Sequence, residues 1–182
     1  MEHQEELNYI KRILDGETNL FSYFLDRYSR PIHSLIVQIV QCREDAEELT
    51  QDAFVKAFRK LDSYKGDCSF STWLYRIAYN TAISATRKQK KEFLAIDDNT
   101  INNVPDEDVD VVLGRAEDDD TIRKLEVAVS RLNAEEGVLI TLFYKEEKSI
   151  DEVASILKLT PVNVKVKLHR TRKKLYVLIN NL

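Results

Sequence analysis

Apolar residues recur at helical spacing along most of the chain and predict a series of amphipathic helices. In the N-terminal half they mark segments near residues 7–14, 20–28, 32–39 and 43–61, with Pro31 separating the second from the third. The chain has only 4 Gly and 3 Pro, which is too few turn-forming residues for the many hairpins of a β-sandwich or barrel. We therefore expect an all-α fold.

The helix expected over residues 43–61 has one apolar side and one mainly acidic side. The apolar side consists of Ala46, Leu49, Ala53, Phe54, Ala57, Phe58 and Leu61, which are expected to be buried. The other side carries Asp45, Glu48, Gln51 and Asp52, which we call the acidic ridge. Such a ridge is often a solvated face whose carboxylates favour a helix N-terminus. The strongly basic segment that follows favours instead two surfaces for partners of opposite charge.

The basic segment also contains many aromatic residues. Residues 56–91 hold nine basic and two acidic side chains, and residues 65–67 form an expected turn. Ser71 or Thr72 is expected to cap the helix that follows. On that helix the predicted buried stripe is Leu74, Ile77, Ala78, Thr81 and Ala85, and the predicted exposed arc is Arg76, Asn80, Ser84 and Arg87.

Aromatic rings beside cations, amides and hydroxyls suit single-stranded nucleic acid, because rings stack on bases and cations bind phosphates. The run Arg87, Lys88, Gln89, Lys90 and Lys91 extends this basic surface. The residues leave open whether Trp73 and Tyr75 belong to this surface or to the core. They also leave open whether the basic run is only a solvated helix end.

A helix-turn-helix is predicted near the C-terminus. Ser149 and Glu152 have the spacing of a capping box, and Lys158 marks the end of a short helix. Thr160 followed by Pro161 then opens a longer helix, with Thr160 as its N-cap. On this second helix the expected core side is Val164, Leu168, Thr171, Leu175 and Leu178.

The opposite side of the second helix is basic but also carries two valines. It presents Val162, Val166, His169, Arg170 and Lys173, flanked by Lys165, Lys167, Arg172 and Lys174. In a DNA major groove the valines would contact thymine methyl groups while the cations hold phosphates. A contact with another helix or a protein partner is the alternative. Seven basic residues between Lys158 and Lys174 favour DNA.

The net charge of −4 hides three unlike segments. Residues 1–95 hold 14 basic and 14 acidic side chains, residues 96–120 hold one basic and 10 acidic, and residues 121–182 hold 12 basic and 7 acidic. The middle segment has the composition of an acidic, flexible linker. We therefore expect two small helical domains, residues 1–95 and 121–182, joined by a tether at residues 96–120.

Several functional classes are excluded by composition. The two cysteines lie 26 residues apart with no histidine at ligand spacing, so neither a zinc site nor a disulfide is expected. No nucleophile–base pair or metal cluster is evident, so we expect no enzyme activity and no cofactor. No apolar run approaches the roughly 18 residues of a membrane span. A cytoplasmic protein without membrane insertion is expected.

The two motifs, in this order, resemble the sigma factors of bacterial RNA polymerase, in particular the extracytoplasmic-function (ECF) group. Residues 45–54 through 70–80 carry the first part of the resemblance, and residues 149–154 through 164–175 carry the second. The resemblance covers nearly the whole chain. It implies a region 2-like helical bundle and a region 4-like helix-turn-helix domain.

The resemblance also implies partners and roles. Core RNA polymerase would be bound through its clamp helices and flap region, and the expected clamp contacts are Asp45, Glu48, Leu49, Gln51 and Asp52. The melted −10 promoter strand would contact Tyr64, Lys65, Gly66, Asp67, Phe70, Ser71, Thr72, Trp73, Arg76, Asn80, Ser84, Arg87 and Lys88. In this reading residues 64–70 capture a base flipped out of the promoter, which costs a few kcal/mol recovered by stacking and hydrogen bonds.

The duplex −35 element would contact the second helix of the helix-turn-helix. The expected residues are Thr160, Val162, Asn163, Lys165, Val166, Lys167, His169, Arg170, Arg172 and Lys173. Family members also imply an anti-sigma factor as partner, and a tether that runs toward the RNA exit path, unless it is only a solvated spacer. The alternatives to promoter-directed initiation are a stand-alone helix-turn-helix regulator and a protein that sequesters the polymerase. The residues do not determine how the two domains sit relative to each other.

Overall fold

Every regular element that the structure describes is helical. The computed structural model describes residues 2–86, 101, 103–105 and 119–182. The N-terminal group consists of α1 (Glu2–Leu14), η1 (Thr18–Phe21), α2 (Ser22–Val40), α3 (Arg43–Arg59), η2 (Leu61–Ser63) and α4 (Phe70–Thr86). The C-terminal group consists of α7 (Asp119–Ser130), α8 (Ala134–Ile140), η3 (Thr141–Lys145), α9 (Ile150–Leu157) and α10 (Pro161–Asn180). The expectation of an all-α fold is confirmed for these residues.

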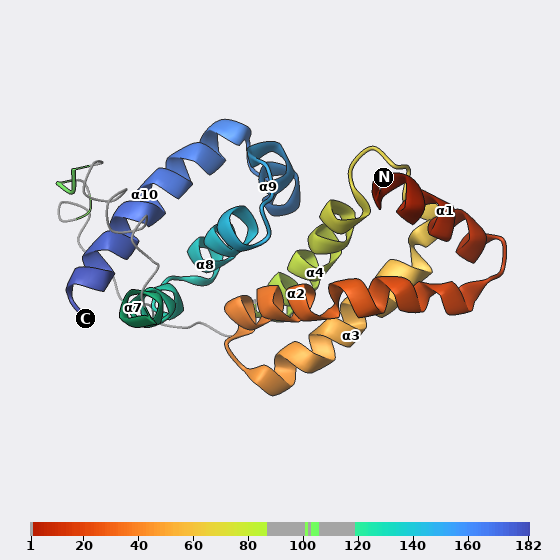
Figure 1. Ribbon diagram of the computed structural model, residues 1–182, viewed down its shortest axis with the longest axis horizontal. Coiled ribbons are helices and arrows are strands. Elements are labelled where there is room, and N and C mark those ends of the chain that lie inside the picture. Colours follow the sequence, from red (N-terminus) through yellow and green to blue (C-terminus); the bar gives the residue numbers. More distant parts are fainter. Residues whose placement is uncertain (1, 87–100, 102, 106–118) are drawn as a thin grey trace.

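The two groups lie side by side and touch directly (Figure 1). In the N-terminal group α2, α3 and α4 pack against one another, and α1 lies at the far end of the molecule. In the C-terminal group the long helix α10 packs against α7, α8 and α9. Helix α2 contacts α8, and α4 contacts α9. These two contacts between the groups fix a relative placement that the sequence had left undetermined.

Helix α2 runs through Pro31 without a break, so the separation expected there is wrong. Proline removes a backbone donor and its ring crowds the carbonyl of Arg27, one turn earlier. The helix persists because its apolar side is deeply buried: Ile32, Leu35 and Ile36 have no exposed surface. Burial of side chains of this size contributes about 1.5–3 kcal/mol each, which outweighs the local cost of the proline.

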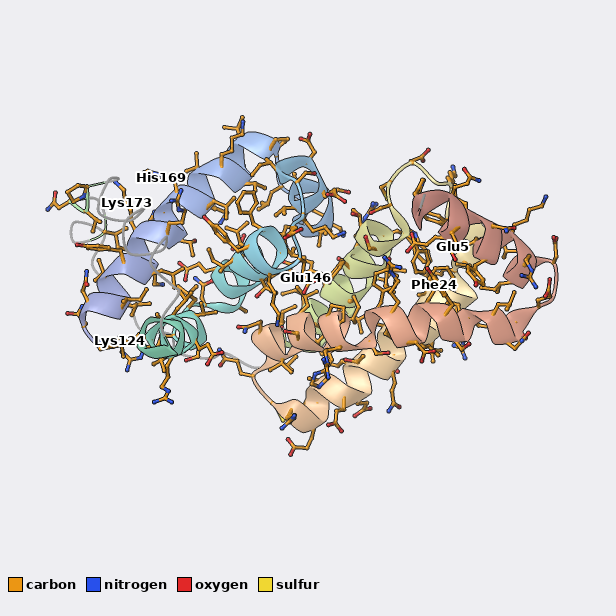
Figure 2. All side chains as sticks on the ribbon, in the orientation of Figure 1. Glu5, Phe24, Lys124, Glu146, His169 and Lys173 are labelled. Carbon is orange, nitrogen blue, oxygen red and sulfur yellow. The ribbon has the colours of Figure 1, made fainter. Side chains whose placement is uncertain are left out.

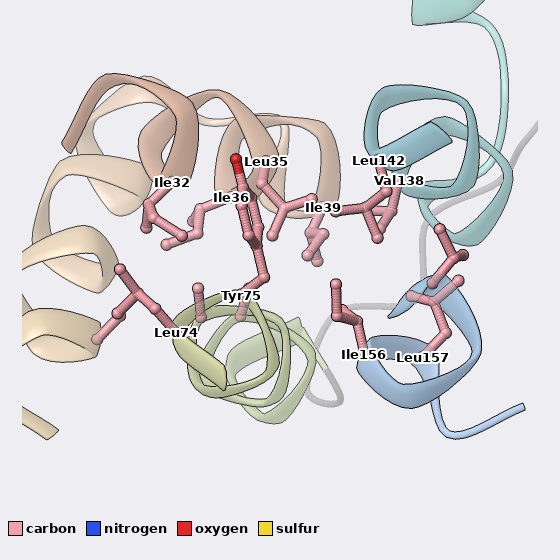
Figure 3. Packing of buried hydrophobic residues seen from close by; sticks show 14 of the residues in the cluster. Ile32, Leu35, Ile36, Ile39, Leu74, Tyr75, Val138, Leu142, Ile156 and Leu157 are labelled. Atoms are coloured by element: carbon pink, nitrogen blue, oxygen red, sulfur yellow. The ribbon is translucent and has the colours of Figure 1, made fainter. Parts of the chain in front are cut away.

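One apolar cluster passes through both groups of helices (Figure 3). Tyr75 of α4 lies in it with 2% of its surface exposed, close to Ile39 of α2 and Ile156 of α9. Tyr75 is therefore a core residue, which settles the question that the sequence had left open. Two other expectations are wrong: Phe58 is 40% exposed, and Ala85 lies on the surface.

The caps predicted for the helix-turn-helix are confirmed. Ser149 and Glu152 form the capping box of α9, and Lys158 ends that helix in the left-handed conformation at φ 57°. Thr160 Oγ1 accepts a hydrogen bond from the Asn163 backbone N–H at 3.2 Å and so caps α10. These bonds satisfy backbone groups that a helix end otherwise leaves without partners.

Most of the acidic tether expected at residues 96–120 lies outside the described residues. Within that range Ile101 and Val104 are buried, with 3% and 8% of their surfaces exposed. Helix α7 begins at Asp119, two residues before the expected start of the C-terminal domain. Of the helices that the structure describes, none combines the length and apolar character needed to cross a lipid bilayer.

Candidate functional site

The acidic ridge lies exposed on α3, as its spacing predicts. Asp45, Glu48, Gln51 and Asp52 are all exposed. Leu49 is half-buried and borders a small hollow of about 240 Å³, together with Asp45 and Glu48 on one side and the end of α4 on the other. The carboxylates near the start of α3 also interact favourably with its helix dipole. The ridge is thus a rigid, solvent-facing surface of negative charge.

An apolar groove adjoins the ridge and was missed by the sequence analysis. It has a volume of about 1110 Å³ and lies between α2 and α3, with Gln51 on its border. Three large apolar side chains line it while remaining partly exposed: Leu25 at 38%, Val55 at 46% and Phe58 at 40%. The sequence did contain one sign of this groove: Val55 is apolar but lies outside the predicted buried side of its helix. Partly exposed apolar side chains around one hollow are typical of protein-binding surfaces.

The loop before α4 is held by its own hydrogen bonds. The Tyr64 hydroxyl donates to the Cys68 carbonyl oxygen at 2.5 Å, and Gly66 takes a positive φ of 77° that favours glycine. Burial, with the nearby Cys68, raises the pKa of Tyr64 to about 12. Tyr64 therefore stays a neutral donor. The loop presents Lys65 and Asp67 on the surface.

The cap of α4 differs from the expected one. The Thr72 backbone N–H donates to Ser69 Oγ at 3.2 Å, so the N-cap is Ser69 rather than Ser71 or Thr72. The helix consequently begins at Phe70, a turn earlier than a cap at Thr72 would allow. This places Ser71 and Thr72 in the first turn of α4, where their hydroxyls contact the C-terminal group.

Phe70 is the centre of an aromatic cluster and is wholly buried. Its ring centroid lies 4.1 Å from that of Phe24, 5.8 Å from that of Tyr64 and 5.6 Å from that of Trp73. Thr72 also has no exposed surface, so neither Phe70 nor Thr72 can touch a DNA strand in this conformation. Trp73 is half-buried, so it belongs partly to the core and partly to the surface. Phe70 therefore supports the loop from beneath.

The outer side of α4 is polar, and the hydrogen bonds of Asn80 and Ser84 on this side stay within the helix. Asn80 Nδ2 donates to the Arg76 carbonyl at 2.6 Å, and Ser84 Oγ donates to the Asn80 carbonyl at 2.7 Å, both within the helix. Arg76 Nη2 lies 3.6 Å from Cys68 Sγ of the loop. Arg87 and Lys88, also expected in this surface, lie outside the described residues.

Two lysines that the sequence analysis did not single out adjoin this side of α4. Lys56 of α3 and Lys60, the residue that follows this helix, line a hollow of about 270 Å³ together with Asn80 and Ser84. The sequence did point to these two lysines, because the excess of basic over acidic residues in residues 56–91 begins at the end of α3. The hollow combines cations with amide and hydroxyl groups, the donors that hold phosphates and base edges.

The outward side of α10 has the predicted composition. Val162 and Val166 are 68% and 61% exposed, far more than a helix core position allows. Asn163, Lys165, His169 and Arg170 are also exposed, and His169 and Lys173 lie along α10 in Figure 2. Lys167 forms a 3.1 Å ion pair with Glu135.

Three basic residues of α10 are less exposed than expected. Lys174 is not on the outward side: it is 7% exposed and donates to Glu136 at 2.8 Å. Arg172 and Lys173 are half-buried rather than fully outward.

Two glutamates of the C-terminal group face α4. Glu146 lies between the two groups of helices (Figure 2) and accepts a 2.5 Å hydrogen bond from the Tyr75 hydroxyl. Burial and this bond raise the pKa of Tyr75 far above its ordinary value. Burial alone would raise the pKa of Glu152, but the hydrogen bond from Thr72 and those from Ser149 lower it below the ordinary value. Glu152 is therefore ionised at neutral pH.

Two family models match the chain. The model for Sigma-70 region 2 matches residues 24–92, and the model for Sigma-70, region 4 matches residues 122–175. Together they cover the greater part of the chain and include the three surfaces described above, from the ridge to the outward side of α10.

Individual relatives and solved structures agree with these matches. The chain is 28% identical over 172 residues to the ECF RNA polymerase sigma factor SigW of Bacillus subtilis, covering 91% of this chain and 92% of SigW. It is 42% identical over 73 residues to the ECF RNA polymerase sigma-E factor of Escherichia coli, covering 40% and 38%. Its fold is similar to CnrH in complex with the cytosolic domain of CnrY, with a TM-score of 0.67, 21% identity and coverage of 95% and 96%. It is also similar to RpoE in complex with the anti-sigma factor NepR from Bartonella quintana, with a TM-score of 0.65, 21% identity and coverage of 88% and 96%.

Proposed function

Because the chain belongs to the extracytoplasmic-function sigma factors of bacterial RNA polymerase, we propose that its three exposed surfaces divide promoter-directed initiation among them. The observation that carries this division is that the three surfaces differ in chemistry and are centred on different helices, α3, α4 and α10. The first is acidic and apolar, the second polar and aromatic, and the third a basic helix with two exposed valines. Each suits a different partner.

The acidic ridge and the adjoining groove are the proposed docking surface for core polymerase. Interfaces of this kind combine an apolar centre with a charged rim, and the groove and ridge supply these two parts. Val55 and Phe58 would insert into the partner, while Asp45 and Asp52 would meet basic residues around it. We place the clamp helices of the polymerase here. The flap region is the proposed partner of the C-terminal group.

The loop before α4 and the outer side of α4 are the proposed surface for the melted −10 strand. Trp73 offers a ring for stacking, and Arg76 and Asn80 offer donors to bases and phosphates. We add Lys56 and Lys60, which border the same hollow as Asn80. Phe70 acts indirectly, by holding the loop in shape.

The outward side of α10 is the proposed reader of the −35 duplex. A recognition helix of a helix-turn-helix lies in the major groove, where Val162 and Val166 would meet thymine methyl groups. Lys165 and Arg170 would contact phosphates or guanine edges. Thr160 contributes by capping the helix, so its first turn keeps its position on the DNA.

Other parts of the proposal concern location, chemistry and regulation. A factor that acts on RNA polymerase would work in the cytoplasm and would need no catalytic centre of its own.

An anti-sigma factor is a further proposed partner, supported by the fold neighbours CnrH and RpoE, which were solved with CnrY and with the anti-sigma factor NepR. The apolar groove and the side of α4 are the surfaces that such an inhibitor would cover.

Asn80→Ala and Lys165→Ala are expected to impair different steps. Removing the Asn80 amide should cost about 1–3 kcal/mol of open-complex stability, since its hydrogen bonds to the melted strand are lost. Removing the Lys165 cation should weaken −35 duplex binding by about 1–3 kcal/mol and leave strand capture intact. Permanganate footprinting of the melted region and duplex binding by the reconstituted holoenzyme measure the two steps separately.

Lys11→Ala is the matched control for Lys165→Ala, because it removes one exposed positive charge from α1, a helix that belongs to neither proposed DNA surface. It should leave both measurements unchanged. If Asn80→Ala and Lys165→Ala impaired both steps equally, the division of roles between α4 and α10 would be wrong.

A further inference from the structure

A buried carboxylate joins α1 to α2 near the loop before α4. Glu6 of α1 is 5% exposed and is the only buried acidic side chain among the residues that the structure describes. Its Oε1 atom accepts a hydrogen bond from the Tyr28 hydroxyl of α2 and lies 3.9 Å from Arg27 Nε. Burying a charge costs free energy, and an apolar pair of similar size is often at least as stable. Stability alone therefore does not explain the carboxylate.

The bond to Glu6 is connected to the loop through aromatic rings. Burial and this bond raise the pKa of Tyr28 well above its ordinary value, so its hydroxyl stays a donor at neutral pH. The Tyr28 ring centroid lies 6.0 Å from that of Phe70, which lies 5.8 Å from that of Tyr64 in the loop. Because closely packed side chains transmit displacements, a shift of Tyr28 would move the rings that support the loop.

Leu7, the residue after Glu6, touches the loop directly. A Cβ atom built on Gly66 would lie 3.8 Å from Leu7 Cδ2, which is ordinary van der Waals contact. Gly66 is also the residue at which the loop takes its positive φ of 77°. Figure 1 shows the N-terminal end of α1 beside this loop. The bond that fixes Glu6 therefore also fixes the side chain against which the loop turns.

Helix α1 is attached to the core by other residues. Ile10 and Ile13 are 5% and 4% exposed and belong to the apolar cluster. They follow Glu6 by four and seven residues and so share its side of the helix. These two side chains suffice to anchor α1, and Glu6 lies at the end of the helix that meets the loop. Helix α1 also precedes residues 24–92, which the Sigma-70 region 2 model matches.

We propose that Glu6 is a positioning residue for −10 recognition: its bond to Tyr28 holds the aromatic rings and Leu7 where they keep the loop before α4 in the shape that accepts a flipped base. Glu6 itself contacts no DNA. The inference rests on the proposed function, which takes this loop as part of the −10 surface. Discrimination between bases depends on such support, because the groups that read a base must be held within about 0.5 Å of their working positions.

The double variant Glu6→Leu/Tyr28→Phe separates positioning from stability. It removes both polar groups together, so neither is left buried without its partner, and leucine is a strong helix former. Unfolding in urea should show the stability of the wild type. Holoenzyme reconstituted with this variant should nevertheless discriminate about tenfold less well between a −10 single strand and the same strand with one base changed.

The strand is taken from start sites mapped with the reconstituted polymerase, and the changed base is the one to which the wild-type holoenzyme is most sensitive. Unlabelled strands compete with a fluorescent strand, and anisotropy gives the ratio of their affinities. The affinities for core polymerase and for −35 duplex should equal those of the wild type, since the proposed surfaces for these partners are centred on α3 and α10.

Two single variants serve as controls. Glu6→Gln keeps the shape of the side chain and an oxygen that accepts from Tyr28, so it should discriminate like the wild type. Glu5→Leu makes the same change as at Glu6 on an exposed position of α1, and it should also leave discrimination unchanged. If either control lost as much discrimination as the double variant, the hydrogen bond would not be the cause and the inference would be wrong.

Leu7→Ala tests the second contact independently. Leu7 is half-buried, and alanine is the best helix former, so α1 should stay folded. Loss of the neighbour of Gly66 should lower the same ratio of affinities while leaving −35 duplex binding unchanged.

The outcomes separate the inference from the proposed function. If the folded double variant or the Leu7→Ala protein discriminates like the wild type, the inference is overturned while the proposed function stands. If the wild-type holoenzyme itself binds every altered strand equally, the −10 role of the loop and α4 fails, and the inference with it.

Discussion

Core RNA polymerase is expected to bind the Val55→Asp protein about 30- to 1000-fold more weakly than the wild type, a loss of about 2–4 kcal/mol. Val55 lies in the apolar groove of about 1110 Å³ beside the acidic ridge. At the centre of an interface an aspartate would lose its hydration without gaining a partner. Because Val55 is 46% exposed in the free chain, the substitution should leave the fold intact. Fluorescence anisotropy of labelled protein titrated with core polymerase measures the affinity.

Leu14→Asp is the matched control, since Leu14 of α1 is also a partly exposed apolar residue on a helix, at 51%, but lies outside the groove and outside the C-terminal group. Its affinity for core polymerase should equal that of the wild type. Unfolding in urea should show that both variants are folded. Unchanged affinity of the folded Val55→Asp protein would remove the groove from the proposed docking surface.

Phe70→Ala should lower the free energy of unfolding by about 3–5 kcal/mol, the usual cost of removing a buried aromatic ring and leaving a cavity. Phe70 has no exposed surface, and its ring packs among those of Phe24, Tyr64 and Trp73. The loop before α4 would lose its support together with the core. Urea denaturation followed by circular dichroism measures the change.

The same truncation at Phe58 serves for comparison, because Phe58 is 40% exposed and leaves a smaller cavity. Phe58→Ala should cost clearly less stability than Phe70→Ala. If Phe70→Ala were as stable as the wild type and defective only in binding the −10 strand, Phe70 would contact DNA directly, as the resemblance first implied.

Local signals in the sequence were sufficient for the helix-turn-helix. Ser149 and Glu152 cap each other through groups three residues apart, and Thr160 bonds to a backbone N–H three residues on. Such bonds depend on neighbours in the chain, so a sequence pattern predicts them well. The core side of α10 was likewise predicted from its spacing. This succeeded because α10 packs against three helices, α7, α8 and α9.

Expectations failed where the deciding neighbour is distant in the sequence. Periodicity places Phe58 on the apolar side of α3, but α2 leaves a groove there instead of covering it. Tyr75 was ambiguous because the atoms that bury it belong to α9 and to Glu146, about seventy residues away. Pro31 suggested a helix boundary, yet burial of Ile32, Leu35 and Ile36 keeps α2 continuous.

The central claim is that this chain directs core polymerase to promoters, and mapping of transcript 5′ ends tests it most directly. Core polymerase is incubated with genomic fragments with and without the purified protein, and the starts that depend on the protein are sequenced. We predict new starts at defined sites, each preceded by one shared −10 and one shared −35 element, and their loss with the Val55→Asp protein. Binding of the protein to duplex DNA without any new start would contradict the claim and indicate a stand-alone regulator.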